Sequence, residues 1–209
     1  MSTQRRGLIA VISGPSGSGK GTRINRIVKQ DANVCYAVSA TTREMRYGEA
    51  EGVTYYYKSD AEFDALVAAS EILEWDSFCG YKYGTLRSEL ESKISQGQDV
   101  ILDLTVPGAR AIKKAFPEDC VTAFILPPSI EELEHRIRGR QRETEEQLKL
   151  RVAEAQREIE LFREFDYAVI NDDLDTGVDH LWAIIKAERL TYKRNSDVLN
   201  RLNLKGAIV

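Results

Sequence analysis

The chain carries, after its first seven residues, the segment Leu8-Ile-Ala-Val-Ile-Ser-Gly-Pro-Ser-Gly-Ser-Gly-Lys-Gly-Thr22. The continuous apolar run from Leu8 to Ser13 is typical of a strand buried on both faces of a parallel sheet. A glycine-rich turn ending in Lys20 follows, and a helical pattern follows the turn. Strand, glycine turn, lysine and helix in this order predict a phosphate-binding loop.

Glycines in such a loop let successive backbone N–H groups converge on a β-phosphate, and the helix N-terminus adds a favourable dipole. Lys20 would reach the β- and γ-oxygens as a point charge. The residue after Lys20 is Gly21, where the usual loop has a Ser or Thr hydroxyl for Mg²⁺, and Thr22 comes one position later. The predicted ATP-binding loop is Gly14, Pro15, Ser16, Gly17, Ser18, Gly19, Lys20, Gly21 and Thr22, and we assign no protein ligand to the metal.

The predicted first helix has apolar residues at Ile24, Ile27 and Val28. This spacing predicts that its cations, Arg23, Arg26 and Lys29, face solvent. Three further short apolar runs fit central strands, at Val100–Leu104, Val121–Leu126 and Tyr167–Ile170.

Helical patterns separate these runs. Capping boxes at Ser129-x-x-Glu132 and Thr144-x-x-Gln147 mark two helix starts, and a long charged helix is expected from about residue 145 to 163. The stretch from Ser39 to Gly84 is instead aromatic, alternating and turn-rich, with a capped helix at Ser59-x-x-Glu62. The pattern predicts an α/β fold, a parallel sheet flanked by helices with one strand-rich insertion.

Composition limits the function. With 209 residues, 43% of them hydrophobic, the chain can bury one substantial core. The net charge of −4 provides no basic field for nucleic acid or an anionic membrane, so neither is an expected partner. The apolar run at Leu8 is too short for a signal peptide or a membrane span, and we expect a soluble, cytoplasmic protein.

Cysteine and histidine contribute little to the expected chemistry. Cys35, Cys79 and Cys120 are scattered and odd in number, which favours reduced structural thiols. His135 and His180 have no ligand or nucleophile at motif spacing, so a histidine-based triad or metal hydrolysis is poorly supported.

Downstream motifs narrow the class. The segment from Val38 through Thr41-Thr-Arg43 and Gly48-Glu49 to Tyr55 resembles the acceptor-binding segment of guanylate kinases, and the resemblance extends from about residue 8 to 190. Further matches are Glu74-Trp75, Gly80-x-x-Tyr83-Gly84-Thr85, Ile101-Leu102-Asp103, Arg136-x-x-Gly139-Arg140, Arg151 and Asn171-Asp172-Asp173. The resemblance implies a P-loop kinase core at 1–38, 91–130 and 156–209, a GMP-binding insertion at 39–90 and a helical lid at 131–155.

The resemblance also implies residue roles. It assigns Arg43, Arg46, Tyr55 and Tyr83 to the acceptor phosphate, Ser39, Glu74 and Thr85 to the guanine base, and Asp103 to a position near the acceptor and the metal. A guanidinium offers a planar fork of donors suited to phosphate oxygens. A carboxylate matches the adjacent N1–H and N2 amino donors of guanine.

Arginines crowd the segment from Glu131 to Arg151. The resemblance maps phosphate-directed lid arginines onto Arg136, Arg140 and Arg151, and places Asn171 near the adenine of the donor. Arg138 and Arg142 are instead expected on a solvated face with nearby glutamates. The predicted catalytic residues are Lys20, Arg43, Arg140 and Arg151.

The chain departs from the family pattern at two positions. Thr105 stands where a second acidic residue is usual, and Gln141 replaces the glycine after a lid arginine. The loop sequence Lys-Gly-Thr is similar to that of nucleoside monophosphate kinases, which suggests that Mg²⁺ is held largely by ATP phosphates and water.

The expected reaction is transfer from ATP, with Mg²⁺ as cofactor, to GMP and also dGMP in purine nucleotide metabolism. Two alternatives stay open, a paralogue acting on another phosphorylated acceptor such as a sugar bisphosphate, and a non-catalytic guanylate-kinase-like binding module. Retained Glu74 argues against the first, and retained Lys20 argues against the second. The sequence is compatible with a homo-oligomer.

Overall fold

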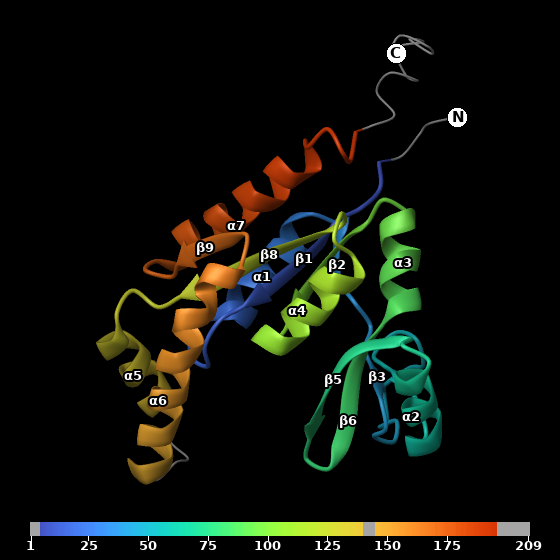
Figure 1. The fold of residues 1–209 in the computed structure, drawn as a ribbon, viewed down its shortest axis with the longest axis horizontal. Helices are drawn as coiled ribbons and strands as arrows, with labels where there is room; N and C mark the ends of the chain where they lie inside the picture. The colour runs from blue at the N-terminus through green and yellow to red at the C-terminus, as the bar shows by residue number, and fades with distance from the viewer. Residues whose placement is uncertain (1–4, 140–144, 196–209) are drawn as a thin grey trace.

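The structure of the protein is a computed structural model that describes residues 5–139 and 145–195. Its main sheet has five strands in the order β2-β7-β1-β8-β9, and every neighbouring pair is parallel (Figure 1). The strands are β1 (Ile9–Ser13), β2 (Val34–Tyr36), β7 (Asp99–Asp103), β8 (Cys120–Leu126) and β9 (Tyr167–Ile170). Parallel pairing directs the carboxyl ends of all five strands to one edge, where ligands bind in open α/β sheets.

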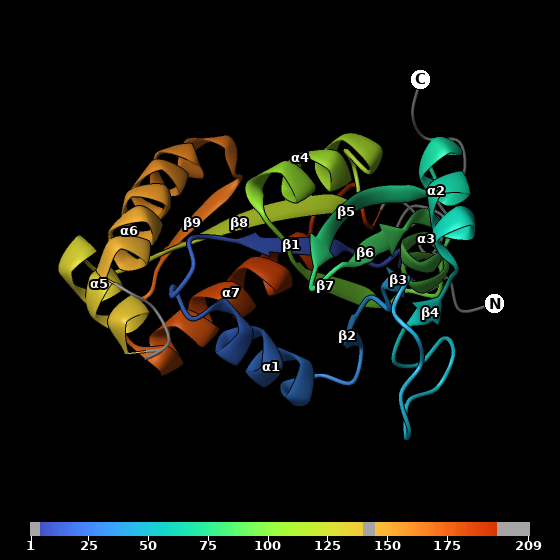
Figure 2. The same cartoon turned by 90° about the horizontal axis from the view of Figure 1, so that it is seen from below.

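Helices cover both faces of this sheet, as Figure 2 shows. The helices α1 (Lys20–Gln30) and α7 (Leu174–Arg189) cover one face, and α3 (Arg87–Ser95) and α4 (Val106–Ala115) cover the other. Along β1, Ala10 and Ile12 pack toward the first pair, whereas Ile9 and Val11 pack toward the second. Successive side chains of a strand point to opposite faces, so a strand covered on both sides is apolar throughout.

A second, four-stranded sheet forms the insertion, with the order β4-β3-β6-β5. Its strands are β3 (Ala40–Thr41), β4 (Tyr56–Tyr57), β5 (Ile72–Phe78) and β6 (Tyr81–Leu86), and β5 and β6 form an antiparallel hairpin. The helix α2 (Asp60–Ala68) packs on this sheet through the fully buried Phe63. The predicted capping box at Ser59 and Glu62 is present at the start of α2.

Two further helices, α5 (Ile130–Arg138) and α6 (Glu145–Glu160), pack together, and the short 3-10 helix η1 (Leu161–Glu164) follows α6. Their contact has its own small apolar cluster of Leu133, Ile137, Leu148 and Ala155. In Figures 1 and 2 this helical pair lies at the opposite side of the main sheet from the insertion. A ligand at the sheet edge can therefore be contacted from both sides.

An internal anchor holds the far end of the main sheet. The carboxylate of Asp99, at the start of β7, is fully buried. It accepts hydrogen bonds from Arg5 (2.7 and 2.8 Å), from Arg189 in α7 (2.6 Å) and from the backbone N–H of Leu8 (3.0 Å). Residues near both ends of the described chain thus share one carboxylate.

The four predicted central strands are confirmed to within one residue at each end, whereas the edge strand β2 was not predicted. The prediction that Arg23 faces solvent was wrong, because only 5% of its surface is exposed. Ser129 caps α5 by accepting from the Glu132 N–H, but the side chain of Glu132 pairs with Arg136. Thr144, Gln141 and Arg142 lie outside the described residues. The three cysteines are free thiols.

No helix within residues 5–139 and 145–195 is long and apolar enough to cross a membrane.

Candidate active site

The predicted phosphate loop lies between β1 and α1, at the carboxyl edge of the sheet. Gly14, Gly17 and Gly19 have φ values of +142°, +87° and +82°, a region that favours glycine. A Cβ atom on Gly14 would also lie 2.4 Å from the carbonyl oxygen of Ile125 in β8. The close approach of the loop to the sheet therefore requires glycine at this position.

The N-terminus of α1 is left open for an anion. The residue before the helix is Gly19, no side chain caps the helix, and no acidic residue lies in its first turn. The Nζ of Lys20 donates to the carbonyl oxygens of Gly14 (2.6 Å) and Pro15 (3.3 Å), so the ammonium group lies over the loop. Backbone donors and a lysine together suit a phosphate chain.

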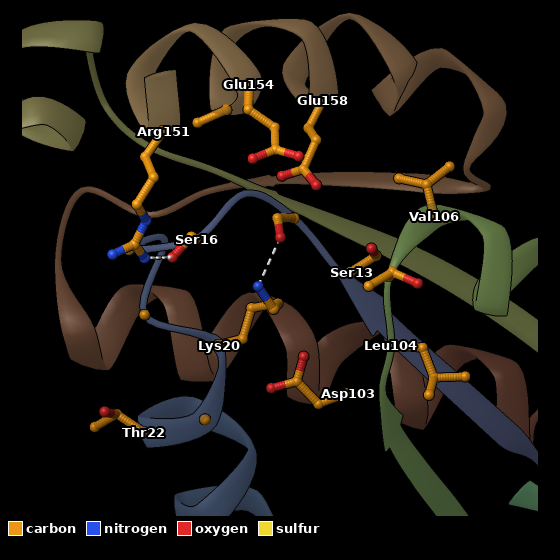
Figure 3. Close-up of a pocket in the computed structure, with 16 residues that line it drawn as sticks. Ser13, Ser16, Lys20, Thr22, Asp103, Leu104, Val106, Arg151, Glu154 and Glu158 are labelled. Atoms are coloured by element: carbon orange, nitrogen blue, oxygen red, sulfur yellow. Dashed lines mark hydrogen bonds between the residues drawn. The ribbon is translucent and has the colours of Figure 1, made fainter. Parts of the chain in front are cut away.

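A cavity of about 620 Å³ opens above this loop (Figure 3). Its other walls are the end of β7 and one face of α6. From α6, Arg151 donates a hydrogen bond of 2.6 Å to the hydroxyl of Ser16 in the loop. The structure thus brings the predicted lid residue Arg151 and the predicted loop together.

Glu154 and Glu158 of α6 also line this cavity, and the sequence interpretation missed them (Figure 3). Burial raises the pKa of Glu158, the nearby Glu154 raises it further, and the charge of Lys20 lowers it. Glu154 and Glu158 follow Arg151 by three and seven residues, the spacing of one helical face. This spacing could have predicted from the sequence that they line the same cavity as Arg151.

A second cavity, of about 330 Å³, lies between the main sheet and the insertion. It brings together five of the predicted acceptor residues, Ser39, Glu74, Tyr83, Thr85 and Asp103. The two cavities share three consecutive residues, Asp103 at the end of β7 and the following Leu104 and Thr105. The two cavities therefore adjoin at the end of β7.

Asp103 ends β7 beside Ile12 of β1 and lines both cavities. Although the residue is exposed at the strand end, desolvation by the surrounding protein raises the pKa of its carboxyl group, and the charge of Lys20 opposes that rise.

Glu74 is held on two sides. It lies opposite Thr85 in the β5–β6 hairpin, and the Thr85 hydroxyl donates to Glu74 Oε1 at 2.5 Å. Its other oxygen, Oε2, would lie 3.3 Å from a Cβ atom built on Gly108 in α4, so glycine leaves room for it. Burial raises the pKa of Glu74, and the Thr85 hydrogen bond opposes this shift.

Arg43 lies beyond β3 in a separate aromatic cluster. Its guanidinium pairs with Glu49 at 2.7 Å and lies 5.4 Å from the ring centroid of Tyr55, which in turn contacts the ring of Tyr83. The Arg43 pair is the main reason that the pKa of Glu49 falls to about 2, and Tyr57 also donates to this carboxylate. The sequence interpretation gave Glu49 and Tyr57 no role, although both belong to the matched segment or border it.

Arg46 is exposed, and its backbone N–H donates to the same Glu49 carboxylate at 2.8 Å. Of the four residues predicted for the acceptor phosphate, only Tyr83 lines the second cavity. The ring of Tyr55 contacts Tyr83, and the guanidinium of Arg43 contacts both tyrosines. The cluster thus adjoins the predicted acceptor cavity through Tyr83.

The remaining predicted ATP residues lie around the back of the loop. Arg136 in α5 pairs with Glu132, and its Cβ lies 3.9 Å from the position of a Cβ on Gly17. Asn171, after β9, is 1% exposed and donates its side-chain N–H to the carbonyl oxygen of Ser18. Arg140 lies outside the described residues.

The lining fits a magnesium ion bound through ATP. Asp103, Glu154 and Glu158 provide hard oxygen donors in the first cavity, with the hydroxyls of Ser16, Thr22 and Thr105. Among the residues with described positions, no three acidic, histidine or cysteine side chains group closely enough to hold an ion by themselves. This donor set suits an ion whose inner ligands are phosphate oxygens and water.

Comparison with known proteins gives one consistent family. The family model for guanylate kinase matches residues 6–188. A protein named guanylate kinase from Desulfitobacterium hafniense is 44% identical to this chain over 191 residues. One of the same name from Symbiobacterium thermophilum is 43% identical to it over 209 residues. The first alignment covers 91% of this chain and 95% of the relative. The second covers 100% of this chain and 99% of the relative. The crystal structure of guanylate kinase from Anaplasma phagocytophilum has a TM-score of 0.71 and 30% identity, with 98% of each chain covered.

Proposed function

The chain belongs to the guanylate kinase family and phosphorylates GMP to GDP, and we propose that its two adjoining cavities divide the substrates. ATP binds above the phosphate loop, and GMP binds between the main sheet and the insertion. The observation that carries this proposal is that both cavities share the wall formed by Asp103, Leu104 and Thr105.

On the donor side, backbone N–H groups of the loop and of the α1 N-terminus bind the phosphates of ATP. Lys20 moves from its carbonyl partners to the β- and γ-oxygens, and Arg151 reaches the γ-phosphoryl group from α6. The contact of Arg151 with Ser16 supports this assignment, because it already places a cation at the loop. Arg140 stays a prediction of the same kind.

On the acceptor side, Glu74 accepts from N1–H and the N2 amino group of guanine, with Ser39 and Thr85 beside it. Arg43, Arg46, Tyr55 and Tyr83 bind the acceptor phosphate. For this role Arg43 exchanges part of its pairing with Glu49 for phosphate oxygens, which are also anionic acceptors.

In the reaction, an oxygen of the GMP phosphate attacks the γ-phosphorus, and the bond from that phosphorus to the β,γ-bridging oxygen breaks. The bond's electron pair stays on the departing ADP. The acceptor phosphate is already ionised near neutral pH, so the site must mainly position the groups and stabilise charge. Closure of the α5–α6 pair over the donor excludes water, which otherwise competes as acceptor.

When ATP carries Mg²⁺, the ion would supply charge neutralisation at the transferring phosphates. Asp103, Glu154 and Glu158, which line the ATP cavity, would hold the hydrated ion through its water ligands.

We also propose that residues 39–90 form the GMP-binding unit, that dGMP is accepted, and that the protein works in the cytoplasm. A steady-state assay of ADP formation with GMP, dGMP, AMP and a sugar bisphosphate tests the choice of acceptor. We expect GMP and dGMP to support turnover and AMP to be poor. Preference for the sugar bisphosphate would favour the paralogue, and ATP binding without any transfer would favour the binding module.

A further inference from the structure

Arg23 is a buried cation directly behind the phosphate loop. It lies in the first turn of α1, three residues after Lys20, and is 5% exposed. Within the described part of the chain, no carboxylate lies within 4.0 Å of its guanidinium, although most buried charges in proteins are paired. Burial lowers the pKa of Arg23, the neighbouring charge of Arg136 lowers it further, and the charge of Asp173 raises it.

The guanidinium ties the loop to the segment that carries Asn171. Its Nη1 donates to the carbonyl oxygen of Gly19 (3.2 Å), and its Nη2 donates to the carbonyl oxygen of Asp173 (3.0 Å). Asn171, two residues before Asp173, donates to the carbonyl oxygen of Ser18. Two adjacent carbonyls of the loop are thus held from behind, which leaves its N–H groups for the opposite side.

The surrounding backbone is shaped around this side chain. A Cβ atom on Gly177, inside α7, would lie 2.4 Å from Arg23 Nε. Glycine is unfavourable inside a helix, so its presence here has a local reason. A Cβ on Gly19 would lie 2.8 Å from Arg23 Nη1 and from Asn171 Nδ2.

Three buried polar atoms around this point have no hydrogen-bond partner among the residues that the structure describes, namely Arg23 Nε, Ser18 Oγ and Asn171 Oδ1. Unpaired buried polar atoms are costly, and each one calls for an explanation. An apolar side chain of similar volume often stabilises a buried position as well as a charged one does, so stability alone does not account for an arginine here.

We propose that Arg23 is a positioning residue for the donor nucleotide. It fixes the carbonyls of Gly19 and Asp173 so that the loop N–H groups face the phosphates, and its charge, opposed in part by that of Asp173, adds to the positive potential beneath them. The inference rests on the proposed binding of ATP at this loop. Neither the family resemblance nor the pattern of α1 assigned a role to this residue.

The test compares three variants with a matched control. Arg23→Met removes the charge and keeps the length of the side chain, and Arg23→Lys keeps the charge without the fork. Gly177→Ala retains the arginine and its charge but displaces the guanidinium from its present position. The control is Arg26→Met, one turn along the same helix, whose side chain is 44% exposed and pairs with Asp175 of α7.

The affinity for ADP is measured by calorimetry, KM for ATP and for GMP by steady-state kinetics, and the unfolding midpoint with and without ADP. We expect Arg23→Met to weaken ADP binding by about tenfold, since hydrogen bonds from charged groups contribute at this level. KM for ATP should rise similarly, and KM for GMP should change less than about twofold, because the acceptor cavity is formed by other elements. Gly177→Ala should also weaken ADP binding and raise KM for ATP, and Arg23→Lys should do so to a smaller extent. Arg26→Met should change neither quantity.

If Arg23→Met and Gly177→Ala lowered the unfolding midpoint but bound ADP as the wild type does, Arg23 would have only a structural role. The inference would then fail, and the proposed donor site would stand. Should Arg23→Met not fold, Gly177→Ala and Arg23→Lys decide in the same way. A wild-type chain that did not bind ADP would overturn the proposed donor site and this inference with it.

Discussion

Thr85 and Glu74 lie directly opposite each other in the β5–β6 hairpin, and the Thr85 hydroxyl donates to one carboxylate oxygen of Glu74 at 2.5 Å. This hydrogen bond fixes the rotation of the carboxylate before any acceptor arrives. A preoriented carboxylate can distinguish guanine, which presents two donors, from adenine, whose N1 is an acceptor.

Glu74→Gln should therefore reduce kcat/KM for GMP by about 10- to 100-fold, since a bidentate base contact contributes about 1–3 kcal/mol. The ratio of GMP to AMP activity should narrow, because the amide no longer repels the adenine acceptor. Asp76→Asn is the control, since Asp76 lines the same cavity from the same strand. An unchanged GMP to AMP ratio in Glu74→Gln would remove Glu74 from the base site.

Gly108→Ala should disturb the same carboxylate from the opposite side, because the new Cβ would lie 3.3 Å from Glu74 Oε2. We expect KM for GMP to rise several-fold with little change in KM for ATP. In a Glu74→Ala background the same substitution should have no further effect, since interacting positions are not additive. Additive effects in this double-mutant cycle would contradict the contact.

Lys20→Ala should lower kcat by about 10³-fold or more, because it removes a preorganised charge from the transferring phosphoryl group. Lys29→Ala, in the last turn of the same helix, provides the control. The coupled assay of ADP formation measures both, and circular dichroism checks the fold. Near-normal turnover of Lys20→Ala would refute the phosphate-loop assignment.

Arg43 and Arg151 should separate in kinetics. Arg43→Ala is expected to raise KM for GMP strongly, whereas Arg151→Ala should chiefly lower kcat, because in the proposed arrangement Arg151 reaches the γ-phosphoryl group and Arg43 binds the acceptor. Glu49→Gln removes the partner of Arg43 and should not raise KM for GMP. An unchanged KM for GMP in Arg43→Ala would mean that this cluster does not bind the acceptor.

Thr105→Asp should lower the magnesium concentration that gives half-maximal rate, because Thr105 lines both cavities and a carboxylate there can bind water ligands of the ion. Thr105→Asn, of similar size and without charge, is the control. A magnesium titration identical for all three proteins would show that position 105 takes no part in metal binding.

The core was predictable because its signals are local. The run from Leu8 to Ser13 is apolar on both faces, and the structure buries it on both faces between helix pairs. The edge strand Val34–Tyr36 escaped prediction because it has three residues and only Val34 is buried. So short a segment shows no periodicity.

Arg23 shows where patterns fail. Its position relative to Ile24 and Ile27 does not exclude burial, and its actual environment depends on Gly177, which lies more than 150 residues later in the chain. The same limit applies to Glu49, whose role depends on the approach of Arg43 and Tyr57. Contacts of this kind require the tertiary structure, whereas the loop and Glu74 could be assigned from motifs.

The strand β7 begins at the buried Asp99 and ends at Asp103. At about 3.3 Å per residue, roughly 13 Å separate the carboxylate that ties Arg5 to Arg189 from the one that lines both substrate cavities. A partner protein or affinity tag fused ahead of Arg5 would therefore emerge at the rear edge of the sheet. Substrate entry and movement of the α5–α6 pair would then be unobstructed, which makes this end suitable for immobilising the enzyme.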